Sequence, residues 1–369
     1  SVATDNASNV ESAPVNNDTI CGYDPDPPTG NITLPVNGSF YKSGDPIDIN
    51  ITGTATDPRG VTNVYVYIYN DTDDTYFNGT GWQASSVNLS ANLSGGTPTT
   101  NWWYENTSAF PTWATNKTYI INISTRDAAG NWNETTATAT FGYDTSDPTA
   151  SIDIPSNGTW YNALTNISGT AQDTGGSGVA TVNITIYNAT AGSGGNYWNG
   201  SAWVASAVNL TATGTNSWWY TNVLSWTNGS TYIVNVTVED NAGNQNTTPA
   251  DSNIFYIDTD DLSSQVNAIS PYWQTNSPLA ISVNASDVGS GLHNVTLYYY
   301  YSSTNGTFSG PFNGGVNSTP WLNTSAINFS FDFTTNGSGY YRFYSVATDN
   351  ASNVESAPVN NDTICGYDP

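Results

Sequence analysis

Three stretches of this chain repeat one pattern of alternating hydrophobic and polar residues, and this repetition constrains the fold more than any other feature. Each stretch passes a strand ending in Ala-x-Asp, a glycine-bearing turn and a strictly alternating strand, at intervals of roughly 115 residues. Strict alternation predicts a β-strand with one buried face, and several such strands separated by turns favour an antiparallel β-sandwich. The alternating strands span 64–70, 181–188 and 295–301.

A second landmark precedes the last strand of each stretch. It reads Asp-x-Ala-Gly-Asn at 127–131 and 240–244, and Asp-Asn-Ala-Ser-Asn at 349–353. The pattern resembles the tandem immunoglobulin-like repeats of archaeal and bacterial cell-surface proteins, and the resemblance covers nearly the whole chain. It implies an all-β fold of tandem immunoglobulin-like antiparallel β-sandwich domains. We expect domain 1 at 25–144, domain 2 at 145–258 and a divergent domain 3 at 259–369.

The first 25 residues recur without change at 345–369, so the sequence also repeats with an offset of 344 residues. Repetition at a fixed period is typical of arrays in which one unit is stacked many times. We therefore expect 1–24 to be the final strands of a preceding domain of the third type. An isolated hairpin is only marginally stable in water, and we do not expect these residues to join the domain that begins near Pro25.

The chain carries a net charge of −25, because 30 acidic residues face only 5 basic ones. Repulsion between like charges makes nucleic acid and anionic membrane surfaces poor partners. No apolar run approaches the roughly 18 residues that a membrane-spanning helix needs, so we expect no membrane contact within this segment. The expected partners are copies of the chain itself in a filament or sheath.

The sequence lacks the residue patterns of an enzyme. Its one histidine, His293, opens a predicted strand, where an exposed polar residue is commoner than a general base. Asp73 and Asp74 lie in a predicted loop without an apolar pocket that would raise a carboxyl pKa. We therefore expect no catalytic residues and no enzymatic activity.

Tryptophans offer an alternative site, because exposed rings could stack on sugars. Adjacent strand residues face opposite sides, so the pairs at 102–103 and 218–219 should each put one ring in the core. The Asn-Gly pairs at 78–79 and 199–200 favour type I′ hairpins braced by cross-strand rings. Packing is the stronger interpretation, and carbohydrate binding stays open as an alternative. The same two interpretations apply to Trp82, Trp113, Trp203 and Trp226.

One cysteine occurs in each 344-residue period, and it is seen twice here, as Cys21 and Cys365. An odd cysteine in a secreted chain can form an intermolecular disulfide. Aligning the last strands instead places this cysteine at the core position held by Phe141 and Phe255. We favour a buried free thiol, and we do not expect the two cysteines to pair with each other.

Asparagines in glycosylation sequons are unusually frequent. By count, 31 of the 48 asparagines begin an Asn-x-Ser/Thr sequon without proline, whereas chance placement gives about 12. Sequons are acceptors only in a secretory setting, so the excess predicts an extracellular, N-glycosylated surface protein, with an archaeal surface as the expected source. Alternation places the strand sequons on the outer faces. The predicted acceptors are Asn31, Asn50, Asn78, Asn88, Asn122, Asn166, Asn183, Asn199, Asn235, Asn284, Asn294 and Asn328.

The connectivity of a sandwich predicts that aspartates converge at each domain junction. The linker arrives at the pole where the B–C and F–G loops also lie, and each of these segments carries aspartates. Gathered carboxylates repel one another unless a hard cation such as Ca²⁺ takes their oxygens. The alternative is that each aspartate only caps a turn. The candidate calcium ligands are Asp24, Asp26, Asp57 and Asp127; Asp144, Asp147, Asp173 and Asp240; and Asp258, Asp260, Asp261, Asp287 and Asp349.

These observations predict a structural protein, the repeat unit of an extracellular, N-glycosylated cell-surface filament, sheath or stalk. A repeated module gives length and uniform mechanics, and no segment has the chemistry for turnover. One alternative is the stalk of an adhesin whose binding domain lies outside this segment. Another is a carbohydrate-binding module that uses exposed tryptophans.

Overall fold

The computed structural model describes residues 2–12, 21–105, 109–190, 196–222, 226–246, 248–318 and 325–369. Regular structure in these ranges is β-strand apart from two 3₁₀ turns, Pro46–Asp48 and Phe333–Thr335. Neither turn approaches the length or apolar content of a membrane-crossing helix, and the described ranges contain no other helix.

The chain forms two compact units. Unit 1 comprises Ser1–Pro148 together with the short segments Asp173–Gly178 and Asp240–Asn244. Unit 2 comprises Thr149–Gln172, Val179–Glu239 and Gln245–Pro369.

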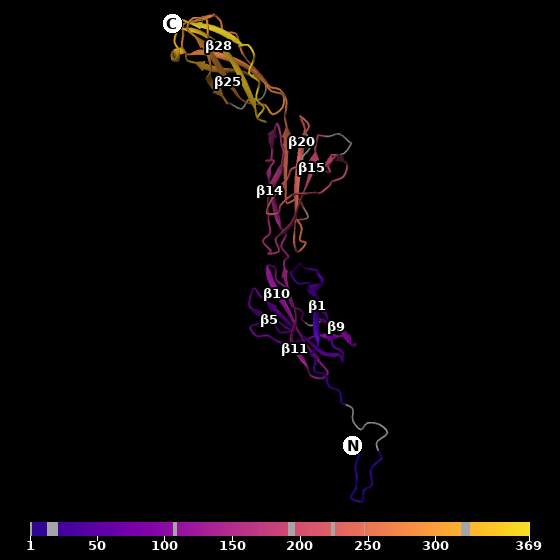
Figure 1. The fold of residues 1–369 in the computed structure, drawn as a ribbon. Coiled ribbons are helices and arrows are strands. Elements are labelled where there is room, and N and C mark those ends of the chain that lie inside the picture. Colours follow the sequence, from indigo (N-terminus) through magenta and orange to yellow (C-terminus); the bar gives the residue numbers. More distant parts are fainter. Residues whose placement is uncertain are drawn as a thin grey trace. The chain divides into compact units, whose positions relative to one another are not determined.

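Unit 1 contains the first sandwich, whose strands are β1 (Thr29–Leu34), β2 (Ser39–Tyr41), β3 (Ile51–Thr56), β4 (Val61–Asn70), β5 (Thr75–Phe77), β6 (Trp82–Gln83), β7 (Leu89–Ser90), β8 (Asn92–Leu93), β9 (Thr99–Tyr104), β10 (Lys117–Asp127) and β11 (Trp132–Tyr143). One sheet has the order β1-β3-β9-β8, and the other has the order β2-β11-β10-β4-β5-β6, with β7 paired to β4. Strand β2 runs parallel to β11, whereas β10 is antiparallel to both of its neighbours, β11 and β4. Strands β10 and β11 are labelled in Figure 1.

The second sandwich lies in unit 2 except for the two segments that belong to unit 1. Its strands are β12 (Thr149–Ile154), β13 (Thr159–Tyr161), β14 (Ile167–Gln172), β15 (Val179–Asn188), β16 (Tyr197–Trp198), β17 (Trp203–Val204), β18 (Leu210–Thr211), β19 (Ser217–Tyr220), β20 (Thr231–Asp240) and β21 (Asp251–Ile257). Its sheets have the orders β12-β14-β19 and β13-β21-β20-β15-β16-β17, with β18 paired to β15. This arrangement repeats the order of the first sandwich.

The third sandwich also lies in unit 2. Its strands are β22 (Ser263–Val266), β23 (Trp273–Gln274), β24 (Leu279–Ser286), β25 (Leu292–Ser302), β26 (Ser309–Asn317), β27 (Ser325–Phe331), β28 (Gly339–Asp349) and β29 (Thr363–Tyr367). Its sheets have the orders β22-β24-β27 and β23-β29-β28-β25-β26, and the two long strands β25 and β28 are labelled in Figure 1.

One topology therefore occurs three times. In the first sandwich, one sheet holds strands A, B, E and D, which are β1, β3, β9 and β8. The other sheet holds strands A′, G, F, C and C′, which are β2, β11, β10, β4 and β5. The equivalent strands of the other two sandwiches divide in the same way, without D. This division of strands is that of an immunoglobulin-like sandwich. The predicted all-β fold of tandem immunoglobulin-like antiparallel sandwiches is confirmed. The expected ranges 25–144, 145–258 and 259–369 each contain both sheets of one sandwich.

A tyrosine near the start of strand F is buried in each sandwich. The hydroxyls of Tyr119 and Tyr232 accept a hydrogen bond from the backbone amide five residues upstream, at 2.8 and 3.1 Å. The hydroxyl of Tyr341 donates to the carbonyl four residues upstream at 2.6 Å. This arrangement is the tyrosine corner that immunoglobulin-like sandwiches use to fix the loop entering strand F.

The A–B–E sheet packs a large residue against a small one in the first two sandwiches. Trp102 lies opposite Gly53 and Trp218 opposite Gly169, and both indole rings are 1% exposed. A Cβ on Gly53 would lie 2.4 Å from the ring of Trp102, so only glycine leaves room for it. The third sandwich fills the equivalent space with the medium-sized pair Val283 and Ile327.

The third sandwich differs again where strand G meets strand F. Cys365 lies opposite Tyr341, at the position that Phe141 holds opposite Tyr119. Cys365 is a fully buried free thiol at the core position predicted by alignment. The same prediction is wrong for its copy Cys21, which is exposed because the described part of 1–24 joins none of the sheets. Cysteine is smaller than phenylalanine, and in the third sandwich the ring of Phe333 also packs on Tyr341, with 4.8 Å between the ring centres.

In each tryptophan pair one ring is buried and the other lies nearer the surface, as predicted. The Asn-Gly hairpins do not have the predicted type I′ turn. Asn78 N donates to Gly81 O at 2.9 Å, which makes a four-residue loop between Phe77 and Trp82. A type I′ turn needs positive φ at both central residues, whereas here Gly79 has φ of 94° and Asn78 does not. The side-chain oxygen of Asn78 instead accepts from the Gly81 amide at 3.0 Å. The second hairpin has the same hydrogen bonds.

Residues 2–12 form a small hairpin of their own. Thr4 bridges Val10, and the equivalent residues Thr348 and Val354 form the same bridge in the third sandwich. Tyr23 is 81% exposed, although its copy Tyr367 is 7% exposed in β29. The described part of 1–24 contributes no strand to the sheets of the first sandwich, and 13–20 lie outside the described residues. Their origin as the end of a preceding domain stays a prediction.

Replacing Gly53 by alanine should lower the free energy of unfolding by about 1–3 kcal/mol. The new Cβ would lie 2.0 Å from Asn31 O and against the Trp102 ring, so backbone or ring must move. Urea unfolding followed by tryptophan fluorescence measures the change. Gly81→Ala is the control, because nothing lies within 4 Å of its Cβ, and it should change stability by less than about 0.5 kcal/mol. Equal effects of the two variants would contradict this packing.

The two cysteines should differ in reactivity although they share the same local sequence. Cys21 is exposed, whereas burial raises the pKa of Cys365 to about 12. Because the thiolate is the nucleophile, a maleimide should label Cys21 in the folded protein and Cys365 only after denaturation. Peptide mass spectrometry reads the two sites separately, and equal labelling of the folded chain would refute the assignment.

Candidate metal centres

Aspartates come together at equivalent places in the three sandwiches. Each group contains an aspartate from the linker before strand A, one from the B–C loop and one at the end of strand F. In every group, one carboxylate oxygen of each residue lies within 4.8 Å of those of the other two. The first cluster is Asp24, Asp57 and Asp127, the second cluster is Asp144, Asp173 and Asp240, and the third cluster is Asp258, Asp287 and Asp349.

The asparagine that ends the Asp-x-Ala-Gly-Asn turn ties each cluster together. In the second cluster, Asn244 donates its backbone amide and its side-chain amide to the two oxygens of Asp240, both at 2.8 Å. The same side-chain nitrogen donates to the Asp144 carbonyl at 2.9 Å. Asn131 and Asn353 make the same three bonds in the other clusters. The strand-F aspartate therefore caps its own turn and also lies in the cluster.

The third cluster is the most deeply buried of the three. Asp258, Asp287 and Asp349 are each at most 2% exposed. Asp258 accepts from Ser290 N, and one oxygen of Asp287 accepts from Gly291 N, both at 2.6 Å. The other oxygen of Asp287 is buried without a hydrogen-bond partner. Burial, followed by the charges of Asp258 and Asp349, raises the pKa of Asp287. A cation would provide the missing partner and offset the repulsion.

The second cluster has more hydrogen bonds. Asp144 accepts from the amide of Ser177 at 3.1 Å and from its hydroxyl at 2.5 Å. Burial acts to raise the pKa of Asp144, but these bonds outweigh it and lower that pKa. Gly175 lies against the same carboxylate, since its Cβ would be 1.7 Å from an Asp144 oxygen. Lys42 donates to the Gly243 carbonyl beside the cluster rather than to a carboxylate.

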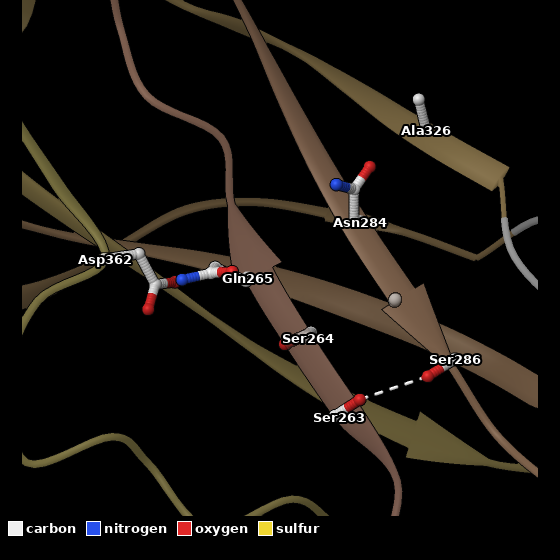
Figure 2. Close-up of a pocket in the computed structure, with 8 residues that line it drawn as sticks. Ser263, Ser264, Gln265, Asn284, Ser286, Ala326 and Asp362 are labelled. Atoms are coloured by element: carbon white, nitrogen blue, oxygen red, sulfur yellow. Dashed lines mark hydrogen bonds between the residues drawn. The ribbon is translucent and has the colours of Figure 1, made fainter.

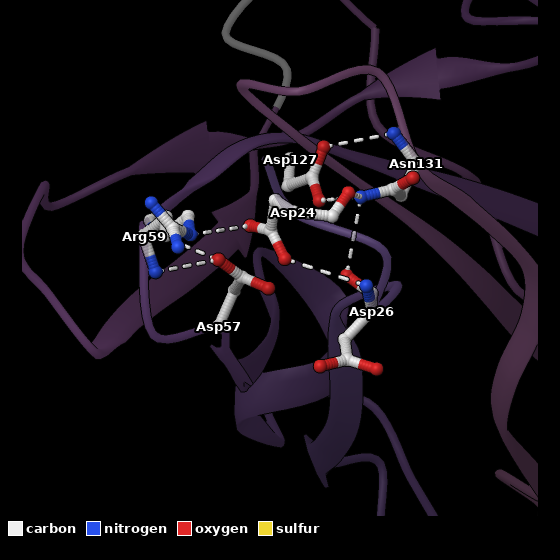
Figure 3. A network of polar contacts seen from close by, with 7 residues as sticks. Asp24, Asp26, Asp57, Arg59, Asp127 and Asn131 are labelled. Carbon is white, nitrogen blue, oxygen red and sulfur yellow. Dashed lines mark hydrogen bonds and ion pairs between the residues drawn. The ribbon is translucent and has the colours of Figure 1, made fainter. Parts of the chain in front are cut away.

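The first cluster contains a basic residue (Figure 3). Arg59 Nε lies 3.3 Å from Asp24, and the Arg59 amide donates to one oxygen of Asp57 at 2.7 Å. The second oxygen of Asp57 is buried without a hydrogen-bond partner. Burial acts to raise the pKa of Asp127, but the hydrogen bonds from Asn131 lower it.

The second acid of each linker lies outside its cluster. Of the predicted ligands, Asp26, Asp147, Asp260 and Asp261 are not among the converging carboxylates. The reason is a turn in the linker. The amide of Asp26 donates to the Asp24 carboxylate at 3.3 Å, and the amide of Asp260 donates to the Asp258 carboxylate at 3.0 Å. That turn carries the next acid away, and Asp260 instead accepts from Asn228. The amides that fill the clusters, from Asn244, Ser177 and Ser290 and their equivalents, were not predicted, although the recurrent Asn was visible in the sequence.

The predicted glycan acceptors are all exposed or half-buried. On the outer faces of strands, Thr138 donates to the side-chain oxygen of Asn122 at 2.7 Å, and Thr211 does the same for Asn183 at 2.9 Å. These bonds engage the oxygen and not the nitrogen that would carry a glycan. Two other sequon asparagines, at 70 and 188, are instead buried at 5% and 7% exposure.

In the described part of the chain, most tryptophan rings pack in or on the cores, and the exposed ring of Trp273 meets those of Tyr272 and Tyr340 at 5.6 and 5.5 Å. Trp113 and the inner rings at 102 and 218 are buried, while Trp82 and Trp203 pack on Tyr119 and Tyr232. Trp219 is 45% exposed, and Trp273, on strand β23 of the third sandwich, is 48% exposed. His293 lies exposed on β25.

A hollow of about 550 Å³ lies on the third sandwich (Figure 2). Small polar side chains of β22 and β24 line it, and the hydroxyls of Ser263 and Ser286 are 3.1 Å apart. Asp362 at its margin accepts from the amides of Val266 and Ser345, at 2.9 and 3.2 Å. The carboxylate is thus used to join two segments of the fold.

Comparison with known proteins gives resemblances of structure only. No family model matches the chain, and no curated protein matches it. The fibronectin(III)-like modules of Clostridium thermocellum CbhA are 16% identical, with 62% of this chain and 94% of that chain covered at a TM-score of 0.30. The FN1–FN3 domains of chicken CNTN1 are 11% identical, with 92% and 98% covered at a TM-score of 0.33. Native Escherichia coli alpha-2-macroglobulin is 10% identical, with 94% and 22% covered at a TM-score of 0.22. Similarity at this level identifies no function.

Calcium should raise the melting temperature of the full chain. A ligand that binds only the folded state stabilises it by RT ln(1 + [L]/Kd), which is about 2.7 kcal/mol for one site at 100 times Kd. Scanning calorimetry at pH 7 with calcium or with chelator measures the shift. No difference between the two conditions would contradict a calcium site in any cluster.

Asp287→Asn should reduce the calcium response and stabilise the calcium-free protein. A carboxyl whose pKa is raised on folding contributes stability at low pH, and this contribution is lost as pH rises through the folded pKa. At pH 7 the amide therefore removes a buried charge that only a cation would compensate. Asp261→Asn, an exposed linker acid outside the cluster, is the matched control. If Asp261→Asn changed the melting temperatures with and without calcium as much as Asp287→Asn does, the change in net charge alone would explain the effect.

Proposed function

We propose that this chain is the structural repeat unit of an extracellular, N-glycosylated cell-surface filament, sheath or stalk. The observation that carries this proposal is the threefold recurrence of one sandwich topology, with the same tyrosine corner and the same acidic cluster in each copy. Recurrence of packing and of loop chemistry together favours a role that depends on repetition rather than on a unique site.

Glycosylation would suit the outer faces of these sandwiches. The predicted acceptors on strands lie outside the cores, and a coat of glycans there would shield sheet edges from pairing with other chains. A net charge of −25 would add repulsion between molecules.

Bound Ca²⁺ would act in these repeats as a structural ion. Each cluster combines a linker aspartate with two loops of the following sandwich, so a shared ion would hold the linker against those loops. Carboxylate oxygens are the ligands that Ca²⁺ prefers, and the third cluster offers three buried carboxylates with an unpartnered oxygen of Asp287. This is a structural and not a catalytic use of the metal, in keeping with the structural role proposed for the chain.

The stalk of an adhesin uses the same architecture and differs only in what lies outside this segment. A carbohydrate-binding module is the weaker alternative, because the exposed rings of Trp219 and Trp273 belong to different sandwiches. Electron microscopy of native material separates these functions. Repeated lateral contacts between copies would support the filament or sheath, and isolated rods would support the stalk.

Mass spectrometry of native glycopeptides should find glycans at Asn122 and Asn235 and none at Asn70 and Asn188. All four begin sequons, but only the first two lie on outer strand faces, while Asn70 and Asn188 are buried. The buried pair is therefore an internal control for accessibility. An unmodified chain at every sequon would refute the glycosylated-surface proposal.

A further inference from the structure

We infer that the guanidinium of Arg59 takes the place of a metal ion in the first cluster, so that part of the negative charge of this cluster is offset by the chain itself. The inference rests on the proposed calcium binding and concerns which clusters take part in it. It makes Arg59 the residue that decides whether the first cluster binds a divalent cation.

The contacts of Arg59 place its charge at the carboxylates. Its Nε lies 3.3 Å from an oxygen of Asp24, and its backbone amide donates to Asp57 at 2.7 Å, as Figure 3 shows. The Arg59 side chain is 56% exposed, whereas that of Asp24 is 8% exposed. The guanidinium therefore reaches the cluster from the solvent side, which is the side from which an ion would enter. Arginine stays protonated at every accessible pH.

The corresponding loop of the third cluster has no such residue. Its sequence after Asp287 is Val-Gly-Ser, and Gly289 lies against Asp258, since its Cβ would be 2.5 Å from the carboxylate. The loop of the second cluster likewise puts Gly175 against Asp144. A glycine leaves the linker carboxylate to amides, hydroxyls or an ion, whereas the first loop provides a fixed positive charge.

A second observation shows that the first cluster could still hold an ion. One oxygen of Asp57, which is 1% exposed, is buried without a hydrogen-bond partner, as is one oxygen of Asp287 in the third cluster. Arg59 forms an ion pair with Asp24 Oδ2, which is itself buried without a hydrogen bond, and leaves that oxygen of Asp57 unpartnered. A divalent ion at Asp57 would meet the positive charge of Arg59, and removing that charge should open the site.

Calcium titration of the full chain by calorimetry, with calcium chloride at low ionic strength, tests the inference. Arg59→Ala should bind one more calcium ion per chain than the wild type does. Arg342→Ala removes the same charge from β28 of the third sandwich, where the guanidinium lies over the ring of Phe308, and it should leave the number of ions unchanged. Arg59→Lys retains the charge and should restore the wild-type number.

The outcomes separate this inference from the proposal on which it rests. A wild type that binds no calcium, beside an Arg59→Ala variant that binds one ion, would refute calcium in the wild-type clusters and uphold the role of Arg59. An unchanged number in Arg59→Ala would overturn the inference, whatever the wild type binds. An equal gain in Arg342→Ala, or a gain in Arg59→Lys, would overturn it too.

Discussion

Buried negative charge is the constraint on which the rest of this structure depends. Asp144 and Asp258 follow the last strands of the first and second sandwiches, and each is at most 1% exposed. A buried carboxylate must be satisfied by hydrogen bonds or by a cation, because leaving it unpaired in a low-dielectric setting is costly. The loops of the next sandwich supply those bonds through Ser177 and Ser290. For this reason Asp173–Gly178 and Asp240–Asn244 belong to the compact unit that contains Asp144.

Facing core residues differ between the sandwiches as pairs, whereas the three aspartates of each cluster are the same in all of them. Gly53 with Trp102 becomes Val283 with Ile327, which preserves volume by dividing it differently. Close-packed interiors tolerate such exchanges when the total volume is kept. The tyrosine corner and the three-residue cluster persist through the divergence, because a hydrogen bond requires particular atoms at particular distances.

The three clusters share a plan but differ in how charge is balanced. The third leaves an oxygen of Asp287 without a partner, the second gives Asp144 two bonds from Ser177, and the first brings in Arg59. A chain with 5 basic residues has few such counter-charges to place. Similar backbone frameworks can therefore have different affinities for a cation.

The sequence by itself determined the fold class and the faces of the strands. Alternation with period two decides which side chains point inward, so the division of Trp218 and Trp219 and the core position of Cys365 could be predicted. Local patterns also identified the asparagines on outer faces, and the same alternation places Asn70, which begins a sequon, on the buried face of β4.

Only the tertiary structure decided which aspartates meet. The linker, the B–C loop and the F–G turn are far apart in sequence, and their approach depends on two sheets packing together. The sequence predicted four or more ligands at each place, whereas a turn at the first linker aspartate carries Asp26 and Asp260 away. It gave no sign that Arg59 would reach Asp24, because a side chain's partner across a loop is fixed by the path of both backbones. The alternation of hydrophobic residues shows which face of a strand is buried, whereas the approach of loops that are distant in sequence depends on the folded structure.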